Sequence, residues 1–262
     1  MIIRLVTFIF ILKITAFYSQ NASFIINGDA SDINVLNENG VSDCNCFQLT
    51  PNQSVKSGSV WNRNKIDLNQ DITLEFKLYL GNNNAGADGV AFAFQPVSDT
   101  VGGDGGGLGI EDVTPSFFVA IDTYQNGSPY NDPAYDHVSI HKNGDVKHNN
   151  SNQLSPAGAP LHVDNYSDLE DDTWRNMKIN WDASLNKFSF YYVDMNNPIL
   201  TYTGDIINNI FSGDPLVYWG MTGATGGAKN LQKFCTLTDI ESPEFNSCPI
   251  DVTIDNSPGD CF

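Results

Sequence analysis

Short hydrophobic runs separated by turn-forming residues are the dominant pattern along the chain. The sequence ITLEFKLYL at residues 72–80 is apolar at every second position, which predicts a strand with one buried face. Val90–Phe94 and Phe117–Ile121 are apolar at every position, as in strands that are covered on both faces. The two strands that contain these runs are expected to extend over residues 89–94 and 117–124. Further strands are expected at residues 137–141, 176–181, 187–193, 216–221 and 231–239.

Helical pattern is almost missing, since only Asp205–Phe211 has a helical character. Residues 182–186, Asp-Ala-Ser-Leu-Asn, form a plausible hairpin loop between two of the expected strands. Many short strands joined by turns are typical of a β-sandwich or barrel and argue against an alternating βαβ fold. The 262 residues are enough for one large all-β domain or for two ordinary domains.

The first 19 residues have the composition of a secretory signal peptide. Arg4 supplies a positive charge, Leu5–Leu12 forms an apolar run, and Lys13 interrupts that run. The run is too short to span a bilayer, and no other stretch approaches the required length, so membrane insertion is not expected. Cleavage is expected between Ser19 and Ala22. The sequence therefore predicts a secreted or cell-surface protein.

Acidic residues dominate the charge of the chain, which has a net charge of −18. Removal of the signal takes away Arg4 and Lys13 and no acid, which leaves 11 basic against 31 acidic residues and a net charge of −20. Such a surface repels nucleic acid and anionic membranes and attracts divalent cations. Solubility alone would also be served by this charge.

Export permits disulfides among the five cysteines. These are Cys44, Cys46, Cys235, Cys248 and Cys261. None has the spacing of a zinc site. The expected disulfide is Cys46–Cys235, between an early and a late strand of one sandwich. The odd number leaves at least one thiol unpaired or paired outside this chain.

The last 21 residues depart from the strand pattern. Ser242–Phe245 reads as a linker, and residues 248–261 resemble the opening strand and turn of a hyalin repeat, an immunoglobulin-like extracellular module. A tail closed by a Cys248–Cys261 disulfide is the alternative. The expected organisation is a signal peptide at 1–19, one domain at 20–241, and a linker with the start of a further module at 242–262.

The acidic residues between Leu78 and His141 have no Lys or Arg among them. They are Asp88, Asp99, Asp104, Glu111, Asp112, Asp122, Asp132 and Asp136. Uncompensated carboxylates in a Gly-rich region need a counter-charge, and a hard cation is the usual one. Asp122, Asn126, Asp132 and the backbone carbonyl of Tyr124 offer the oxygen ligands that Ca²⁺ prefers. By spacing alone, a solvated acidic turn is equally consistent with these residues.

Three segments, in order, resemble the motifs of the L-type (legume-like) lectins. They are Ala87-Asp88-Gly89 before an apolar strand, Val119–Asn126 with Asp132 and His137 downstream, and Trp219–Gly227. The similarity extends from about Ser23 to Ile240, and Gly58–Trp61 and Asn64–Asp67 resemble the bacterial branch of the family. The resemblance implies a concanavalin-like jelly-roll β-sandwich of two antiparallel sheets that binds the glycans of glycoproteins or polysaccharides with Ca²⁺.

The resemblance also implies a role for each residue of the sugar site. Asp88, after a cis bond from Ala87, would accept hydrogen bonds from two sugar hydroxyls. Asn126 would donate its amide to the sugar, and the ring of Tyr124 would stack on the pyranose. A backbone N–H of Gly107, or alternatively of Gly106, would also donate. Gly226, Gly227 and Ala228 would form the remaining wall.

One position departs from the family pattern, because legume lectins use a Glu two residues before the first metal-binding Asp for a second, transition-metal site. This chain has Ala120 there. Asp122, Asp132 and His137 remain, so the resemblance implies Ca²⁺ with the Mn²⁺ site lost. His137 is either a residual metal ligand or a structural imidazole hydrogen-bonded to Asp132.

Other functions fit the sequence less well. The Gly-rich segment Gly102–Gly109 matches no phosphate-binding motif and has no adjacent Lys. A glycoside hydrolase on the same fold would need two carboxylates flanking the scissile bond, and no ExDxxE-type pattern is present. We therefore expect no enzyme activity. The alternatives are such a hydrolase, or an adhesion module without sugar binding. Multivalency through a longer parent chain is the way in which a weak single site would become effective.

Overall fold

A computed structural model describes residues 23–36, 42–99, 105–154, 161–162 and 169–237. The predicted signal peptide and the predicted module at 242–262 lie outside these residues. So do Cys248 and Cys261, and the side chain of Cys44 is not described either. Within the described part, no helix is long and apolar enough to cross a membrane.

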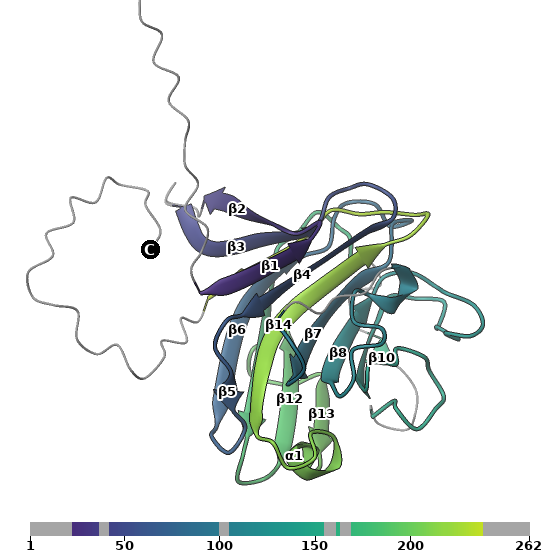
Figure 1. Cartoon of the computed structure of the whole chain (residues 1–262). Coiled ribbons are helices and arrows are strands. Elements are labelled where there is room, and N and C mark those ends of the chain that lie inside the picture. Colours follow the sequence, from purple (N-terminus) through teal and green to yellow (C-terminus); the bar gives the residue numbers. More distant parts are fainter. Residues whose placement is uncertain (1–22, 37–41, 100–104, 155–160, 163–168, 238–262) are drawn as a thin grey trace, which may run out of the picture.

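Two antiparallel sheets form a sandwich, which confirms the predicted jelly-roll fold (Figure 1). The first sheet has the strand order β1-β4-β14-β7-β8-β9-β10, and β5 pairs with β14 at the side of this path. Its strands are β1 (Phe24–Gly28), β4 (Lys56–Asn62), β14 (Leu216–Thr225), β7 (Gly89–Gln95), β8 (Phe117–Asp122), β9 (His137–Lys142), β10 (Leu161–His162) and β5 (Ile66–Asp67).

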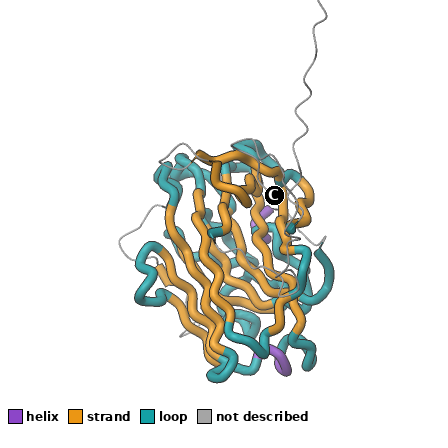
Figure 2. The backbone as a smooth tube through the Cα atoms, turned by 90° about the vertical axis from the view of Figure 1, so that its left-hand side faces the viewer, coloured by secondary structure: helices purple, strands orange, loops and turns teal. Residues whose placement is uncertain are grey.

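The second sheet has the order β13-β12-β11-β6-β15-β3-β2. Its strands are β13 (Leu200–Thr203), β12 (Lys187–Tyr192), β11 (Arg175–Asp182), β6 (Ile72–Tyr79), β15 (Gln232–Thr236), β3 (Ser42–Thr50) and β2 (Ser31–Leu36). Besides strands, the described residues contain a 3₁₀ turn, η1 (Gly105–Gly107), and one short helix, α1 (Ile206–Asn209), inside the segment expected to be helical. Figure 2 shows how strands dominate the fold, with this helix at one end.

Aromatic side chains hold the two sheets together. Phe76 of the second sheet has its ring centroid 5.7 Å from both Phe92 and Trp219 of the first sheet. Phe234, on the neighbouring strand of the second sheet, lies 6.4 Å from Phe76. All four side chains are at most 1% exposed. The alternation seen at residues 72–80 therefore has its predicted cause, because the apolar face of β6 is the centre of the core.

A second apolar cluster covers the opposite face of the first sheet. Ala91 and Ala93 of β7 and Phe118 and Ala120 of β8 lie in it, beneath a loop that includes Ile110. The alternate residues of the same strands face the main core. This confirms the prediction that both strands are covered on both faces, and it fixes β7 and β8 rigidly below the loops that follow them.

The disulfide between Cys46 and Cys235 is present, as predicted. It joins the neighbouring strands β3 and β15, whose cysteines are 189 residues apart in the sequence. Both cysteines are buried. The bond thus fastens an early strand to the last described strand of the same sheet.

The pattern did not indicate β1, β2, β3, β4, β5, β10 or β13, and β4 shows one reason. β4 (KSGSVWN) contains polar and small residues although five of its positions are buried. β14 extends to Thr225, beyond the expected end at residue 221. Gly220 breaks its apolar pattern, yet a Cβ there would lie 2.4 Å from the Trp61 ring, so close packing requires the glycine.

Truncation of Phe76 should be costly because its ring contacts aromatic residues of both sheets. We expect Phe76→Ala to lower the free energy of unfolding by about 3–5 kcal/mol, measured by urea denaturation. Leu185→Ala, at a side chain that is 60% exposed, should change it by less than about 0.5 kcal/mol. Equal effects of the two substitutions would contradict the assignment of Phe76 to the core.

Candidate functional site

Asp88 lies directly before β7 and directly after a cis peptide bond from Ala87. The predicted cis bond is therefore confirmed. The backbone N–H of Asp88 donates to the carbonyl of Ala224 at 2.9 Å, and its carbonyl accepts from the N–H of Thr123 at 3.0 Å. Strand β14 and the end of β8 thus hold the backbone of Asp88 from two sides.

Gly89 allows β7 to start directly after this residue. Its φ of +137° is disfavoured for other residues, and a Cβ would lie 2.3 Å from the carbonyl oxygen of Ile121. Gly89 pairs with Asp122 in the sheet register. The glycine therefore sets the distance between Asp88 and the acidic loop that follows β8.

The carboxylate of Asp88 is only 3% exposed. Burial raises its pKa to about 6, and the side chain of Asn126 and the backbone N–H of Gly226 oppose this shift. Its Oδ2 and the Nδ2 of Asn126 are both buried without a well-formed hydrogen bond among the described residues. The Asn126 amide also acts on the carboxylates of Asp88 and Asp132, so an acceptor and a donor lie side by side. Neither atom has a well-formed hydrogen bond, and a buried polar atom in that state carries a free-energy cost that a ligand can remove.

Asn126 is fixed through its backbone. Its N–H donates to Oδ2 of Asp132 at 2.8 Å, and its carbonyl accepts from the N–H of Asp132 at 3.1 Å. A Cβ on Gly106 would lie 3.1 Å from Nδ2 of Asn126, whereas one on Gly107 would meet Glu111. Gly106 therefore adjoins the Asp88–Asn126 pair, and Gly107 packs away from it.

Carboxylates gather behind this pair. Oδ1 of Asp122 accepts from the N–H of Tyr124 at 2.9 Å. The pKa of Asp122 is well above its usual value, first because of burial and second because of repulsion from Asp132. Burial likewise raises the pKa of Asp132 to about 6. Asp88 and Asp136 add further repulsion at Asp122. The loop is thus short of positive charge.

The outer parts of the predicted site are open. The side chain of Tyr124 is 41% exposed. The loop after β14 is held by Val55, whose N–H donates to the carbonyl of Gly226 at 3.0 Å. A Cβ on Gly226 would lie 3.1 Å from Oδ2 of Asp88, while one on Gly227 would meet nothing within 4 Å. Gly226 therefore borders the Asp88 carboxylate.

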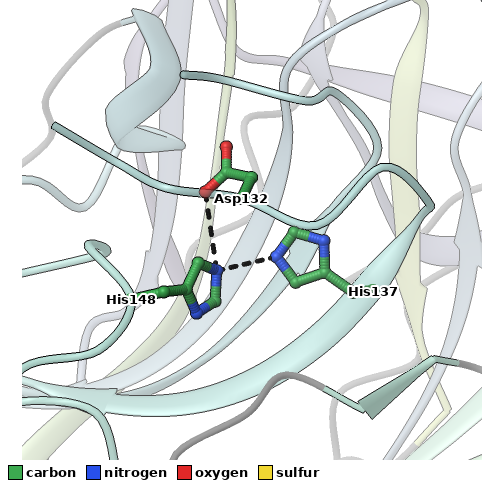
Figure 3. A group of neighbouring side chains, drawn as sticks. All are labelled: Asp132, His137 and His148. Carbon is green, nitrogen blue, oxygen red and sulfur yellow. Dashed lines mark hydrogen bonds and ion pairs between the residues drawn. The ribbon is translucent and has the colours of Figure 1, made fainter. Parts of the chain in front are cut away.

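His148 is the residue that sequence reasoning missed. Its Nε2 lies 2.9 Å from Nε2 of His137 and 3.5 Å from Oδ1 of Asp132 (Figure 3). The expected contact between His137 and Asp132 is corrected, because His148 stands between them. His148 lies in a loop without strand pattern, and the available signal was that three of the four histidines fall within residues 137–148.

These three side chains are also a geometrically possible metal group. Their ligand atoms lie within 4.8 Å of one another, and all three residues are buried. Burial lowers the pKa of His137 to about 3, with repulsion from His148 as the second cause. Burial also lowers the pKa of His148, which favours neutral imidazoles at both positions near pH 7.

The chain belongs to the legume lectin β-barrel domain family, whose sequence pattern matches residues 16–238. This confirms the resemblance on which the expected fold was based. It also agrees with a carbohydrate-binding protein rather than an enzyme. The assignments to the bacterial branch and to a hyalin-like module stay predictions.

Two bacterial proteins are similar in sequence. The pesticidal crystal protein Cry22Aa of Bacillus thuringiensis is 26% identical over 73% of this chain and 29% of its own length. The serine-rich adhesin for platelets of Staphylococcus aureus is 28% identical over 78% of this chain and 10% of its own length. The chain thus spans less than a third of the length of these relatives.

Solved lectin structures share the fold at low sequence identity. Lectin I-B4 of Griffonia simplicifolia, in a metal-free form, superposes with a TM-score of 0.59 at 20% identity, covering 82% of this chain and 91% of that one. The exoplasmic/lumenal domain of VIP36, bound to Ca²⁺ and Man3GlcNAc, also gives 0.59, at 15% identity, covering 84% and 86%. At these identities the likeness concerns the fold alone.

Gly89→Ala should force β7 and β8 apart at the site. We expect a loss of at least about 2 kcal/mol in the free energy of unfolding, because the new methyl group meets a backbone oxygen and φ is strained. Urea denaturation measures this. Gly127→Ala is the matched control, since a Cβ there meets nothing within 4 Å. A Gly89→Ala protein as stable as the control would contradict the packing described.

Proposed function

We propose that this chain is a secreted or cell-surface lectin domain that binds glycans at Asp88 and Asn126, next to a Ca²⁺ ion held by the loop from Asp122 to Asp132. The observation that carries the proposal is the adjacent pair of buried polar atoms, Oδ2 of Asp88 and Nδ2 of Asn126, which lack a well-formed hydrogen bond among the described residues. Family membership supports sugar as the ligand.

Calcium fits the residues that are present. Asp122 and Asp132 are buried carboxylates with raised pKa values, and no Lys or Arg occurs between residues 78 and 141. A divalent cation would remove their mutual repulsion, and Ca²⁺ prefers an oxygen-only ligand set. The expected ligands are these two carboxylates, the side-chain carbonyl of Asn126 and the backbone carbonyl of Tyr124. When bound, the ion would supply charge compensation and fix the direction of the Asn126 amide.

Sugar recognition would follow from one acceptor and one donor placed together. The Asp88 carboxylate can accept from two hydroxyl groups of a pyranose, and the Asn126 amide can donate to one of them. The exposed ring of Tyr124 offers an apolar face for stacking, as sugars require. The backbone at Gly106 and the Gly226–Ala228 segment would border the ligand. Hydrogen bonds to the Asp88 carboxylate are charge-assisted, so they would dominate affinity.

Adhesion is the second proposed role, and the adhesin among the relatives supports it. The chain spans only 10% of that relative, so such a domain would act as one part of a longer protein. A single open sugar site binds weakly, and presentation of several copies would raise the overall affinity. Partners would be glycans of glycoproteins or polysaccharides at a cell surface.

Removal of the Asp88 charge should weaken glycan binding strongly. On a glycan array with CaCl₂, Asp88→Asn should bind at least about tenfold more weakly than the unchanged chain, because charge-assisted hydrogen bonds contribute about 1.5–3 kcal/mol each. EDTA should give the same loss for the unchanged chain, and CaCl₂ should restore binding.

The control for this experiment is Asp194→Asn, at an exposed turn after β12. It should bind as the unchanged chain does. Glycan binding that is unchanged by EDTA and by the Asp88→Asn substitution would overturn the proposed site and favour an adhesion surface elsewhere. Release of a shorter oligosaccharide from a labelled glycan would instead indicate a hydrolase.

Two neighbouring glycines offer a test of the site wall. Gly226→Ala places a methyl group 3.1 Å from Oδ2 of Asp88 and should weaken glycan binding by about tenfold or more, since it takes the space of a sugar hydroxyl. Gly227→Ala meets no atom within 4 Å and should keep most of the affinity. Isothermal titration with the best array ligand measures both. The reverse order would place the ligand on the other side of this loop.

A further inference from the structure

The cluster of Asp132, His137 and His148 lies where the family resemblance implies a second, transition-metal ion. We infer that His137 and His148 instead form a hydrogen-bonded pair with fixed proton positions, which braces the loop in place of that ion. The inference depends on which nitrogen atoms carry protons, and the neighbours of each ring determine this. Only its link to Ca²⁺ and sugar rests on the proposed function.

The proton of His137 is fixed by Tyr135. Nδ1 of His137 lies 3.2 Å from the backbone carbonyl oxygen of Tyr135. A carbonyl oxygen can only accept, so Nδ1 must carry the proton. Nε2 of a neutral His137 then has a free lone pair, and it points at His148 (Figure 3).

The proton of His148 is fixed by Gln153. The side-chain oxygen of Gln153 accepts from the backbone N–H of Asn149 at 2.9 Å, which determines the direction of the amide. Its NH₂ group therefore faces Nδ1 of His148, at 3.0 Å. Nδ1 must accept, so Nε2 of His148 carries the proton.

These assignments agree at the contact between the rings. Nε2–H of His148 donates to the lone pair on Nε2 of His137 at 2.9 Å, and Oδ1 of Asp132 lies 3.5 Å from the same nitrogen. Protons thus point in one direction from Gln153 through both rings to Tyr135. Each of the four imidazole nitrogens in the pair has a partner, in a site where both histidines are at most 3% exposed. A buried network that is fully satisfied rigidifies its surroundings.

A transition metal does not fit this arrangement. The ion would need the lone pairs of both Nε2 atoms, so the proton of His148 would move to Nδ1 and face the NH₂ group of Gln153. Rotation of that amide would place NH₂ against the N–H of Asn149. Metal-bound histidines normally donate their second N–H to a carboxylate or carbonyl, which is the reverse of what Gln153 offers. A further ligand is missing as well, because Ala120 stands where the family resemblance implies a metal-binding Glu.

The brace connects three segments that carry the site. His137 begins β9, and the backbone N–H of His148 donates to the carbonyl of Tyr130 at 2.9 Å. Asp132 contacts His148 with one carboxylate oxygen and holds the N–H of Asn126 with the other. His148 is therefore a positioning residue, which acts on Asn126 through Asp132 and does not contact the sugar.

Proton positions can be measured directly. Long-range ¹H–¹⁵N spectra of the Ca²⁺-loaded chain should show His137 protonated at Nδ1 and His148 at Nε2. Addition of one equivalent of Zn²⁺ should leave both patterns unchanged. Protonation of both rings at Nδ1, or a Zn²⁺-dependent change to that state, would overturn the inference. This experiment needs no sugar, so its result is independent of whether the proposed glycan binding is correct.

Gln153→Glu is the sharpest variant, because it replaces the donating NH₂ by a second accepting oxygen while the other oxygen still accepts from Asn149. Its carboxylate should pull the His148 proton to Nδ1 and create a metal site. In Co²⁺ titrations of the Ca²⁺-loaded proteins, we expect visible absorption bands at one equivalent in Gln153→Glu and none in the unchanged chain. Absorption bands in the unchanged chain that disappear in His148→Gln would overturn the inference. A Gln153→Glu variant that shows no Co²⁺ absorption bands would also contradict it.

The bracing role has its own readout. His148→Gln should weaken Ca²⁺ binding by about tenfold, the usual lower range for partners of metal ligands, as measured by calorimetry. Ser151→Ala, at an exposed position of the same loop, should leave it unchanged. Unaltered Ca²⁺ affinity in His148→Gln would refute the brace. Failure of the unchanged chain to bind any glycan, with these differences intact, would refute only the proposed function.

Discussion

The burial of several carboxylates at the ends of two interior strands, β7 and β8, is the constraint on which the site depends. Asp88, Asp122 and Asp132 are each less than a tenth exposed, and their neighbourhood contributes repulsion rather than positive charge. Such an arrangement persists only where rigid strands enforce it. The two layers of apolar packing around β7 and β8 provide this rigidity. The core thus holds the buried carboxylates close together, in an arrangement that a bound ligand would stabilise.

The sequence predicts those strands in which burial on one or both faces leaves a direct mark on the residue pattern. Residues 72–80, Val90–Phe94 and Phe117–Ile121 illustrate this. Strands such as β4 were missed, since Gly and Ser are buried there for reasons of close approach that depend on residues far away in the chain. Gly220 against Trp61 is the clearest example: neither residue indicates the other before the sheet exists.

The order of the three motifs in the sequence predicted four polar residues of the site, which the structure brings together beside the start of β7 and the end of β8. These are Asp88, Asp122, Asn126 and Asp132. His148 was out of reach because its role depends on a hydrogen-bond direction set by Gln153, five residues further on. The residue types alone indicate that His137, His148 and Asp132 can bind a metal. The direction of one amide decides whether their lone pairs are available, and only three-dimensional contacts reveal that direction.

The strand order has a consequence for assembly. β14 lies between β4 and β7 in the first sheet, and β15 lies between β6 and β3 in the second. The last two described strands are thus central in their sheets, and without them each sheet is divided into two unconnected parts. Because these pairings join segments far apart in the sequence, which form slowly, we expect the two described sheets to be completed late rather than progressively from the N-terminus. Folding must wait until residues 216–236 are available, and Ala224, which holds the backbone of Asp88, arrives in the same step.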